Sequence, residues 1–368
     1  MDPIVLRQKN MIHEGDIMPA YYGETANSCR LEECLLKASD MIGWKEKGMR
    51  TVMPDGKIRA RGVAMAMQGS SISNCDVGSV TVKLSDEGTY HITVGCTDMG
   101  TGCDTIIAQF AADVLETTID NISVYGVDTD ISPYDSGSYA SSTTYLTGMA
   151  AVKACEQLRE HIIALAAARM NKDASALTFD GENVIDESDG SKMSLFDIAT
   201  ASMCNNEISM EVTYSHSSPV SPPPFMAACA EVEVDPETGA IELLDYTACV
   251  DCGTVVNTNL ARVQTEGGLL QGIGMTLYED IWYDERGKNL SNSFMQYKVP
   301  SRLDTDRIRV EFDSSYEPTG PFGAKSIGEI VINTPAPAIA DAVYNATGVW
   351  INELPITPEK ILKGMQVI

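Results

Sequence analysis

Two separate segments of the sequence follow one order of local patterns, and this repetition constrains the fold more than any other feature. Residues 78–116 predict a strand, an Asp-Glu-Gly turn, a second strand, a glycine-containing loop and a helix. Residues 226–280 repeat that order around an Asp-Pro-Glu-Thr-Gly turn. Alternation of apolar and polar residues is typical of half-buried strands, and apolar residues at helical spacing are typical of helices. The repeat therefore predicts an α+β fold that contains two β-hairpin–loop–helix units.

The two ends of the chain add further elements to this plan. The N-terminal segment favours helices and begins with Asp2 and Pro3, a pair that suits the start of a helix. A strand is predicted at residues 307–312. A helix follows near residues 334–348, with prolines at its start and a glycine at its end. We therefore expect C-terminal strands and helices beside the two repeated units.

A proline-rich stretch at residues 215–225 looks like an extended connection between the two units. It divides the chain into an expected first subdomain, residues 1–214, and a second, residues 215–368. No G-x-G-x-x-G sequence follows a predicted strand, and no phosphate-binding P-loop sequence is present. A doubly wound dinucleotide-binding fold is therefore not expected.

Acidic residues strongly outnumber basic residues in the chain. It carries 26 basic and 52 acidic residues, which gives a net charge of −26. Such a chain is repelled by nucleic acid and by anionic membranes, so we expect neither as a partner. The simplest role of this acidity is solubility. No run of 18 apolar residues occurs, so no membrane-spanning helix is expected.

Cysteine and histidine usage bears on the compartment and on metal binding. The ten cysteines show no regular pairing, and the N-terminal residues lack the pattern of a signal peptide. We therefore expect reduced thiols and a cytoplasmic location. The CxxC sequence at residues 249–252 has no second pair at zinc-ribbon spacing, and the four histidines lie outside metal-ligand motifs. We expect no metal ion held directly by side chains of this chain.

Three loops made of small residues precede predicted helices, at residues 98–102, 136–142 and 323–329. Backbone amides at helix N-termini suit anions such as phosphate, and serine hydroxyls add donors. Taken singly, each loop is explained as well by an ordinary tight turn. Together they are consistent with a phosphorylated cofactor held largely by backbone groups.

Four glycines interrupt the second predicted helix, at positions 267, 268, 272 and 274. A glycine inside a helix costs about 1 kcal/mol relative to alanine, so the group calls for an explanation. Close approach of a ligand and tight packing against another part of the chain both account for it.

Glu329 is the only carboxylate in the loop of residues 323–329. Apolar neighbours and exclusion of water would make it a stronger base and suit it for general-base catalysis. The alternative is a structural acid at the start of the following helical turn. Lys325, four residues earlier, could pair with Glu329 or with a phosphate.

Four stretches together resemble one family. They are "DPIVLRQKN" (2–10), "VDCGTVVNTNLARVQTEGGLLQGIG" (250–274), "GAKSIGE" (323–329) and "ELPITPEKIL" (353–362). Their arrangement is similar to the C-terminal half of the molybdenum-binding subunit of the xanthine dehydrogenase and aldehyde oxidoreductase family, the molybdenum hydroxylases. The resemblance runs from one end of the chain to the other.

The resemblance implies a role for each matched position. Glu329 falls on the family's catalytic glutamate, a general base that accepts a proton while oxygen from water is transferred to the substrate. Thr101 stands where the family has glutamine, which leaves a shorter side chain at one cofactor contact. The positions that the resemblance places against the pterin cofactor or its metal centre are Gly100, Thr101, Gly102, Ser138, Ala140, Ser141, Gln264, Lys325, Ile327 and Gly328.

The resemblance also implies cofactors and partners. Molybdenum would be held by the dithiolene of a pterin, as molybdopterin cytosine dinucleotide, and not by protein side chains. The family's upstream half, its [2Fe-2S] domains and its FAD domain do not occur within these residues. We therefore expect a split-type subunit whose partners are a subunit with the N-terminal half of the molybdenum domain, an Fe-S subunit and an FAD subunit.

The implied activity is hydroxylation of a small aromatic N-heterocycle, such as a purine or nicotinate, with water as the oxygen source. Aldehydes are the next class of substrate to expect. Two alternatives stay open: a non-catalytic structural half that supports a paralogous molybdenum subunit, and an inactive fragment.

Overall fold

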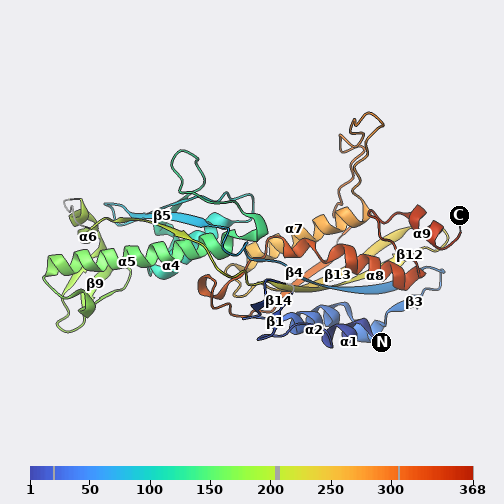
Figure 1. Cartoon of the computed structure of the whole chain (residues 1–368), viewed down its shortest axis with the longest axis horizontal. Coiled ribbons are helices and arrows are strands. Elements are labelled where there is room, and N and C mark those ends of the chain that lie inside the picture. The colour runs from blue at the N-terminus through green and yellow to red at the C-terminus, as the bar shows by residue number, and fades with distance from the viewer. Residues whose placement is uncertain (20, 204–207, 306, 368) are drawn as a thin grey trace. The chain divides into compact units, whose positions relative to one another are not determined.

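The computed structural model describes residues 1–19, 21–203, 208–305 and 307–367 (Figure 1). They form two compact units. Unit 1 comprises Met1–Gln68, Pro222–Pro318 and Ile327–Ile368, and unit 2 comprises Gly69–Ser221 and Thr319–Ser326. Each unit has its own sheet and its own helices.

The main sheet of unit 1 has five strands in the order β14-β13-β12-β4-β3. Neighbouring strands are antiparallel except β13 and β14, which are parallel. The strand bounds are β3 (Arg50–Val52), β4 (Ile58–Met67), β12 (Phe225–Val234), β13 (Ile241–Asp251) and β14 (Ile308–Phe312). A separate short hairpin is formed by β1 (Ile17–Met18) and β2 (Glu24–Thr25).

Helices cover both faces of this sheet, as Figure 1 shows. Helix α2 (Leu31–Ile42) packs on β12 and β13, and α8 (Pro335–Thr347) packs on β4 and β12. Every residue of β12 is buried, because alternate side chains face the two helix layers. The remaining helices are α1 (Pro3–Gln8), α3 (Trp44–Lys47), α7 (Thr258–Leu277), which contacts α8 and β14, and α9 (Pro358–Gly364).

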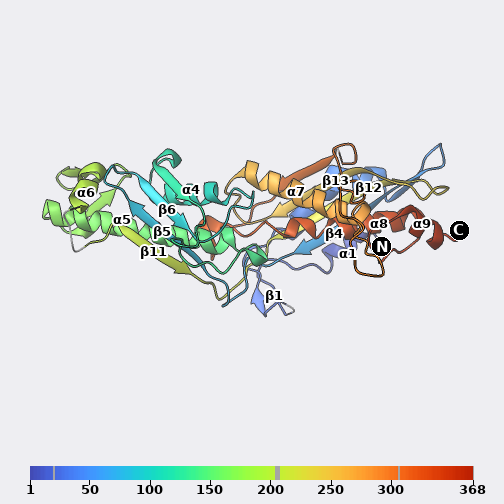
Figure 2. The ribbon, with the colours of Figure 1, turned by 90° about the horizontal axis from the view of Figure 1, so that it is seen from above.

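Unit 2 is built on a four-stranded sheet in the order β11-β5-β6-β7. Its strands are β5 (Gly78–Leu84), β6 (Tyr90–Val94), β7 (Ile122–Tyr125) and β11 (Glu211–His216). Figure 2 shows α5 (Gly148–Met170) lying along β5 and β11. The other regular elements are α4 (Cys103–Val114), α6 (Leu195–Ser202) and a small sheet of β8 (Leu177–Phe179), β9 (Asn183–Asp186) and β10 (Lys192–Ser194).

The repeat predicted from the sequence is confirmed and extends further than expected. Each unit contains a hairpin, a loop and a helix: β5, β6 and α4 in unit 2, and β12, β13 and α7 in unit 1. After the helix, the next strand of each unit pairs in parallel with the second hairpin strand. The parallel pairs β6–β7 and β13–β14 were not predicted, because local pattern carries no information about pairing across a helix.

The α+β fold class is also confirmed. The ends of two helices, α1 and α8, are formed by the residues that the sequence predicts there. The Asp2 side chain accepts a hydrogen bond of 2.7 Å from the amide of Ile4 at the start of α1. Helix α8 ends at Gly348 in the left-handed conformation, as its sequence predicted. Within the described residues, all nine cysteines are free thiols. No helix there has both the length and the apolar character that crossing a bilayer requires.

The compact units interleave along the sequence. Strand β4 pairs with β12 over ten residue pairs, so Ile58–Met67 shares a sheet with residues that follow the proline-rich connection. Pairing between strands so far apart in sequence leaves no mark on local composition. The division into cofactor-binding subdomains at residues 214 and 215 stays a prediction.

Candidate active-site pocket and cofactor loops

A pocket of about 430 Å³ in unit 1 brings several of the predicted residues together. Positions 264, 267, 268 and 271 of α7 form one wall, because spacings of three, four and seven residues fall on one helix face. The complete lining is Gln68, Gln264, Gly267, Gly268, Gln271, Gly328, Glu329, Ile332 and Asn333. Four of these side chains are carboxamides, and one is a carboxylate. Carboxamides both donate and accept hydrogen bonds, so this lining suits a polar heteroaromatic ring such as a pterin.

Gln264 positions the loop that carries Glu329. Its Nε2 donates a hydrogen bond of 3.0 Å to the backbone carbonyl of Gly328. The predicted role of Gln264 was to contact the cofactor. In this structure its amide nitrogen also restrains the residue immediately before Glu329.

Glu329 extends from a firmly anchored turn. The next two residues, Ile330 and Val331, are fully buried, and the amide of Ile332 donates to the Glu329 carbonyl at 3.1 Å. The Glu329 side chain makes no capping hydrogen bond to the helical turn that follows it. The side chain is exposed, so these elements do not provide the exclusion of water that we expected around it.

The four glycines of α7 differ in their surroundings. A Cβ atom at Gly268 would lie 2.2 Å from Val331, and one at Gly272 would lie 2.6 Å from Pro335. A Cβ at Gly274 would lie 2.2 Å from Glu279. At Gly267 an added Cβ would meet no atom within 4 Å, and this residue lines the pocket. Gly268 and Gly272 therefore permit close packing, whereas the flexible Glu279 side chain beside Gly274 can shift, and Gly267 leaves room in the pocket.

The loop of residues 98–102 lies in unit 2, before α4. The Asp98 Oδ1 atom accepts hydrogen bonds from the amides of Gly100 (2.9 Å) and Gly102 (3.0 Å). Partial burial opposes ionisation of Asp98, but these and other backbone hydrogen bonds outweigh it and lower the pKa of Asp98. Two of the amides expected to face an anion are thus bound within the loop. Thr101 is half-buried between them.

The loop of residues 136–142, also in unit 2, holds backbone strain. Ala140 and Ser141 have φ angles of 49° and 54°, in the left-handed region that disfavours residues other than glycine. This conformation costs roughly 1–2 kcal/mol per residue. A π-helical turn, Thr143–Thr147, follows the loop, and the Thr143 hydroxyl donates to the Ser138 hydroxyl at 2.9 Å. Strained backbone and π-turns are concentrated at functional sites, which is consistent with the role predicted for Ser138, Ala140 and Ser141.

The predicted loop of residues 323–329 is divided between the units after Ser326. The Ser326 hydroxyl donates to the Gly69 carbonyl at 2.9 Å, and Lys325 is buried in unit 2. Ile327 packs against the core of unit 1. Of the predicted site residues, unit 1 contains Gln264, Ile327, Gly328 and Glu329, whereas unit 2 contains Gly100, Thr101, Gly102, Ser138, Ala140, Ser141 and Lys325.

Sequence reasoning missed four residues of the pocket, Gln68, Gln271, Ile332 and Asn333. Gln271 lies seven residues after Gln264, so its place on the same helix face could have been found from spacing. Gln68 and Asn333 belong to distant segments, and the Asn333 amide donates to Gln68 at 3.4 Å. No local signal marks that pair.

Comparisons with known proteins agree with the resemblance. The model of the molybdopterin cofactor-binding domain family matches residues 37–306. The probable hypoxanthine oxidase XdhD of Escherichia coli (strain K12) is 36% identical over 380 residues, which cover 100% of this chain and 39% of that protein. The putative xanthine dehydrogenase molybdenum-binding subunit XdhA of the same organism is 30% identical over 371 residues, covering 98% of this chain and 49% of its own length.

A solved structure shows the same fold. Reconstituted CO dehydrogenase from Oligotropha carboxidovorans superposes with a TM-score of 0.87 at 24% identity, covering 100% of this chain and 49% of that chain. In each of these comparisons, the chain therefore spans less than half the length of the protein it matches.

Proposed function

The chain belongs to the molybdopterin cofactor-binding domain family, and on that premise we propose that it is part of a molybdenum hydroxylase. The proposed substrates are aromatic N-heterocycles, purines or nicotinate-like compounds, and the proposed oxygen source is water. The names of the relatives, a hypoxanthine oxidase and a xanthine dehydrogenase subunit, support the purine class. The observation that carries the proposal is the pocket that presents Glu329 among carboxamide side chains.

The pocket lining fits a pterin. Gln68, Gln271 and Asn333 offer donors and acceptors, and Gly267 leaves space beside them. Once bound, the cofactor, molybdopterin cytosine dinucleotide in our proposal, would provide the oxidising power for a two-electron oxidation in which the oxygen comes from water. Further contacts to it are proposed for Ile327 and Gly328 in unit 1, and for Gly100, Thr101, Gly102, Ser138, Ala140, Ser141 and Lys325 in unit 2.

The chemical role that we propose for this chain's own residues is the acceptance of one proton. The Glu329 carboxylate accepts that proton during oxygen transfer, acting as a general base. Gln264 keeps the carboxylate in place through its hydrogen bond to Gly328. The buried side chains of Ile330 and Val331 anchor the turn that follows Glu329. A base held in this way needs little reorganisation when the substrate arrives.

Partners and location belong to the same proposal. Since the chain spans 39% and 49% of the two relatives, the proposed partner is a subunit that carries the other half of the molybdenum domain. Electrons would leave through [2Fe-2S] clusters and FAD on further subunits. The cytoplasmic location stays a prediction.

One observation favours the second candidate, a non-catalytic structural half. The amides of Gly100 and Gly102 bind Asp98, and Thr101 replaces the glutamine of the family, so this loop offers fewer groups to a cofactor. The complete Gly328–Glu329 arrangement in unit 1 favours the catalytic function.

The test is Glu329→Gln in the native complex. This change preserves size and removes the base, so turnover of a purine or nicotinate should fall by about 10²–10⁴-fold at unchanged molybdenum content. Glu353→Gln, at an exposed glutamate outside the pocket, is the matched control and should leave turnover unchanged. Full turnover by Glu329→Gln would refute the role of Glu329. A native complex without molybdenum and without released CMP would refute the proposed function.

A further inference from the structure

Residues 279–305, here called the arm, extend from the body of unit 1 between α7 and β14 (Figure 1). Local hydrogen bonds give the arm a defined hairpin form. The Leu290 amide donates to the Trp282 carbonyl at 2.7 Å, and the Asp284 amide donates to the Lys288 carbonyl at 3.0 Å. Gly287 closes the turn with a φ of 78°, a conformation that glycine adopts without strain. The arm is therefore an ordered element of the fold.

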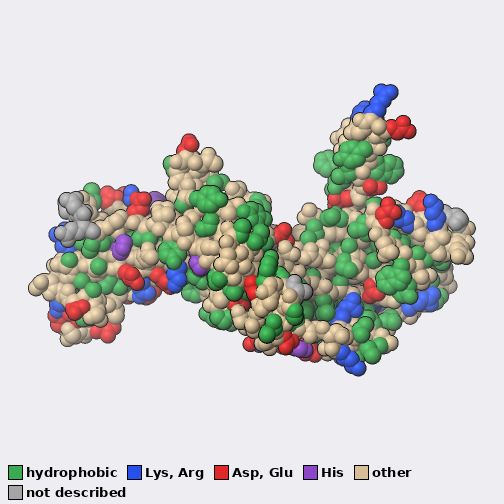
Figure 3. All heavy atoms as spheres, in the orientation of Figure 1, with side chains coloured by type: hydrophobic (Ala, Val, Ile, Leu, Met, Phe, Trp, Pro, Cys, Tyr) green, Lys and Arg blue, Asp and Glu red, His purple; other side chains and the backbone are tan. Residues whose placement is uncertain are grey.

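The arm exposes an unusual amount of apolar surface. Its exposed large apolar side chains are between 45% and 98% accessible: Ile281, Trp282, Tyr283, Leu290, Phe294, Met295, Val299 and Leu303. In Figure 3, hydrophobic side chains gather on the projection that this segment forms. Scattered exposed apolar residues are normal on a protein surface, but a group of this size on one short segment is typical of a binding site.

The composition of the arm is that of an interface. Tryptophan, tyrosine, phenylalanine, methionine and arginine are enriched at the centres of protein–protein interfaces. The arm is also nearly neutral within a chain of net charge −26. It carries five acidic residues, Glu279, Asp280, Asp284, Glu285 and Asp304, and four basic ones, Arg286, Lys288, Lys298 and Arg302.

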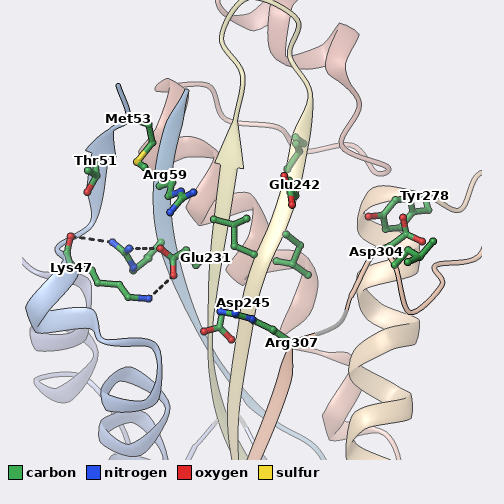
Figure 4. Close-up of a pocket in the computed structure, with 15 residues that line it drawn as sticks. Lys47, Thr51, Met53, Arg59, Glu231, Glu242, Asp245, Tyr278, Asp304 and Arg307 are labelled. Atoms are coloured by element: carbon green, nitrogen blue, oxygen red, sulfur yellow. Dashed lines mark hydrogen bonds and ion pairs between the residues drawn. The ribbon is translucent and has the colours of Figure 1, made fainter. Parts of the chain in front are cut away.

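A polar groove of about 880 Å³ begins where the arm rejoins the body (Figure 4). Leu303, which is 98% exposed, belongs both to the arm and to the lining of this groove. Charges inside the groove are largely compensated, because Glu231 pairs with the buried Arg61 and with Lys47 at 2.8 Å. An apolar centre beside a polar margin is the usual anatomy of a protein interface.

The arm and the groove lie away from the Glu329 pocket. Gln271 is the last residue of α7 that lines that pocket, whereas Tyr278, just beyond the end of α7, lines the groove. Seven residues separate these two positions, about 10 Å at the helical rise of 1.5 Å per residue. The groove and the pocket have no lining residue in common.

We propose that the arm docks the polypeptide that corresponds to the part of the relatives that this chain does not match. This inference rests on the proposed function. The two relatives are more than twice as long as this chain, so more than half of each relative has no counterpart in it. A large aromatic side chain buries roughly 150–250 Å². Trp282, Tyr283 and Phe294 together would thus supply a substantial share of the about 800 Å² that each partner buries in a stable complex.

A second copy of this chain fits the arm less well. Dimerisation would bring together two chains that each carry a net charge of −26. Their mutual repulsion opposes such a dimer over the rest of the surface.

The experiment uses the full chain, tagged and purified with its native partners. The arm variant combines Trp282→Ser, Phe294→Ser and Leu303→Ser, and the control variant combines Ile119→Ser, Phe196→Ser and Met203→Ser, which are exposed apolar residues of unit 2. Exposed side chains of this kind affect folding little. Wild type and control should co-purify with a polypeptide whose sequence matches the uncovered part of the relatives, and the arm variant should retain at least tenfold less of it.

A photo-crosslinking amino acid at position 294 identifies the contact directly. Crosslinks to the same polypeptide support the proposal. Crosslinks only to a second copy of this chain, or wild-type retention of that polypeptide by the arm variant, overturn it. Molybdenum content of the wild-type complex tests the proposed function separately. A molybdenum-loaded complex with an unaffected arm variant defeats only the docking inference, and a crosslinked complex without molybdenum defeats only the function.

Discussion

Gly267 and Gly268 are adjacent in α7 but should differ clearly in their response to replacement by alanine. At Gly268 the new Cβ would lie 2.2 Å from Val331 Cγ2, and Val331 is fully buried. At Gly267 the new Cβ would meet nothing within 4 Å. Both changes gain about 1 kcal/mol of helix propensity, so the difference between the two variants isolates the cost of the close contact.

The size of that difference follows from the packing. Forcing an extra methyl group into a well-packed core costs about 1–3 kcal/mol. Gly267→Ala should therefore stabilise unit 1 by roughly 0.5–1 kcal/mol, and Gly268→Ala should be less stable than Gly267→Ala by roughly 1–3 kcal/mol. Because Val331 follows Glu329 by two residues, the displaced turn should also lower turnover in Gly268→Ala.

Urea unfolding followed by tryptophan fluorescence measures the effect. All three tryptophans, Trp44, Trp282 and Trp350, belong to unit 1, and Trp44 is buried, so the signal reports on the right unit. With a slope of about 2 kcal/mol per molar urea, the midpoints of the two variants should differ by roughly 0.5–1.5 M. Equal midpoints would refute the packing argument. Gly267→Ala should also bind less molybdenum cofactor despite its higher stability, because its methyl group enters the pocket.

Two further predictions concern the loops. Gln264→Leu removes the hydrogen bond to the Gly328 carbonyl. The unfolding free energy of unit 1 should therefore fall by about 1 kcal/mol, and kcat should fall at unchanged molybdenum content. A wild-type kcat in this variant would show that Gln264 does not position Glu329. The lowered pKa of Asp98 means that its stabilisation of the 98–102 loop is complete above the usual carboxyl value, about 4, and is lost as the pH falls through the lower folded-state value. The protection factors of the Gly100 and Gly102 amides, taken relative to the intrinsic exchange rate at each pH, should therefore fall as the pH drops below about 4. Asp98→Ala should lower the same protection factors at neutral pH, and unchanged protection in this variant would contradict the role of Asp98.

Local chemistry accounts for the elements that were predicted correctly. The hairpins β5–β6 and β12–β13 follow from alternation around glycine-containing turns, and α1 and α8 follow from their cap residues. The glycines of α7 were recognised as unusual, but whether each met a neighbour or open space depended on Val331, Pro335 and other residues far along the chain.

The sequence by itself determined the α+β class, the repeated hairpin–loop–helix plan and the family, because each depends on residues that are close together in the chain. Only the tertiary structure decided that β4 joins the sheet of β12, that Gln68 and Asn333 complete the pocket, and that Gln264 holds the carbonyl before Glu329. The physical reason is that strand pairing and side-chain contacts over long sequence separations are selected by burial of the whole core, and no short window of sequence contains that information.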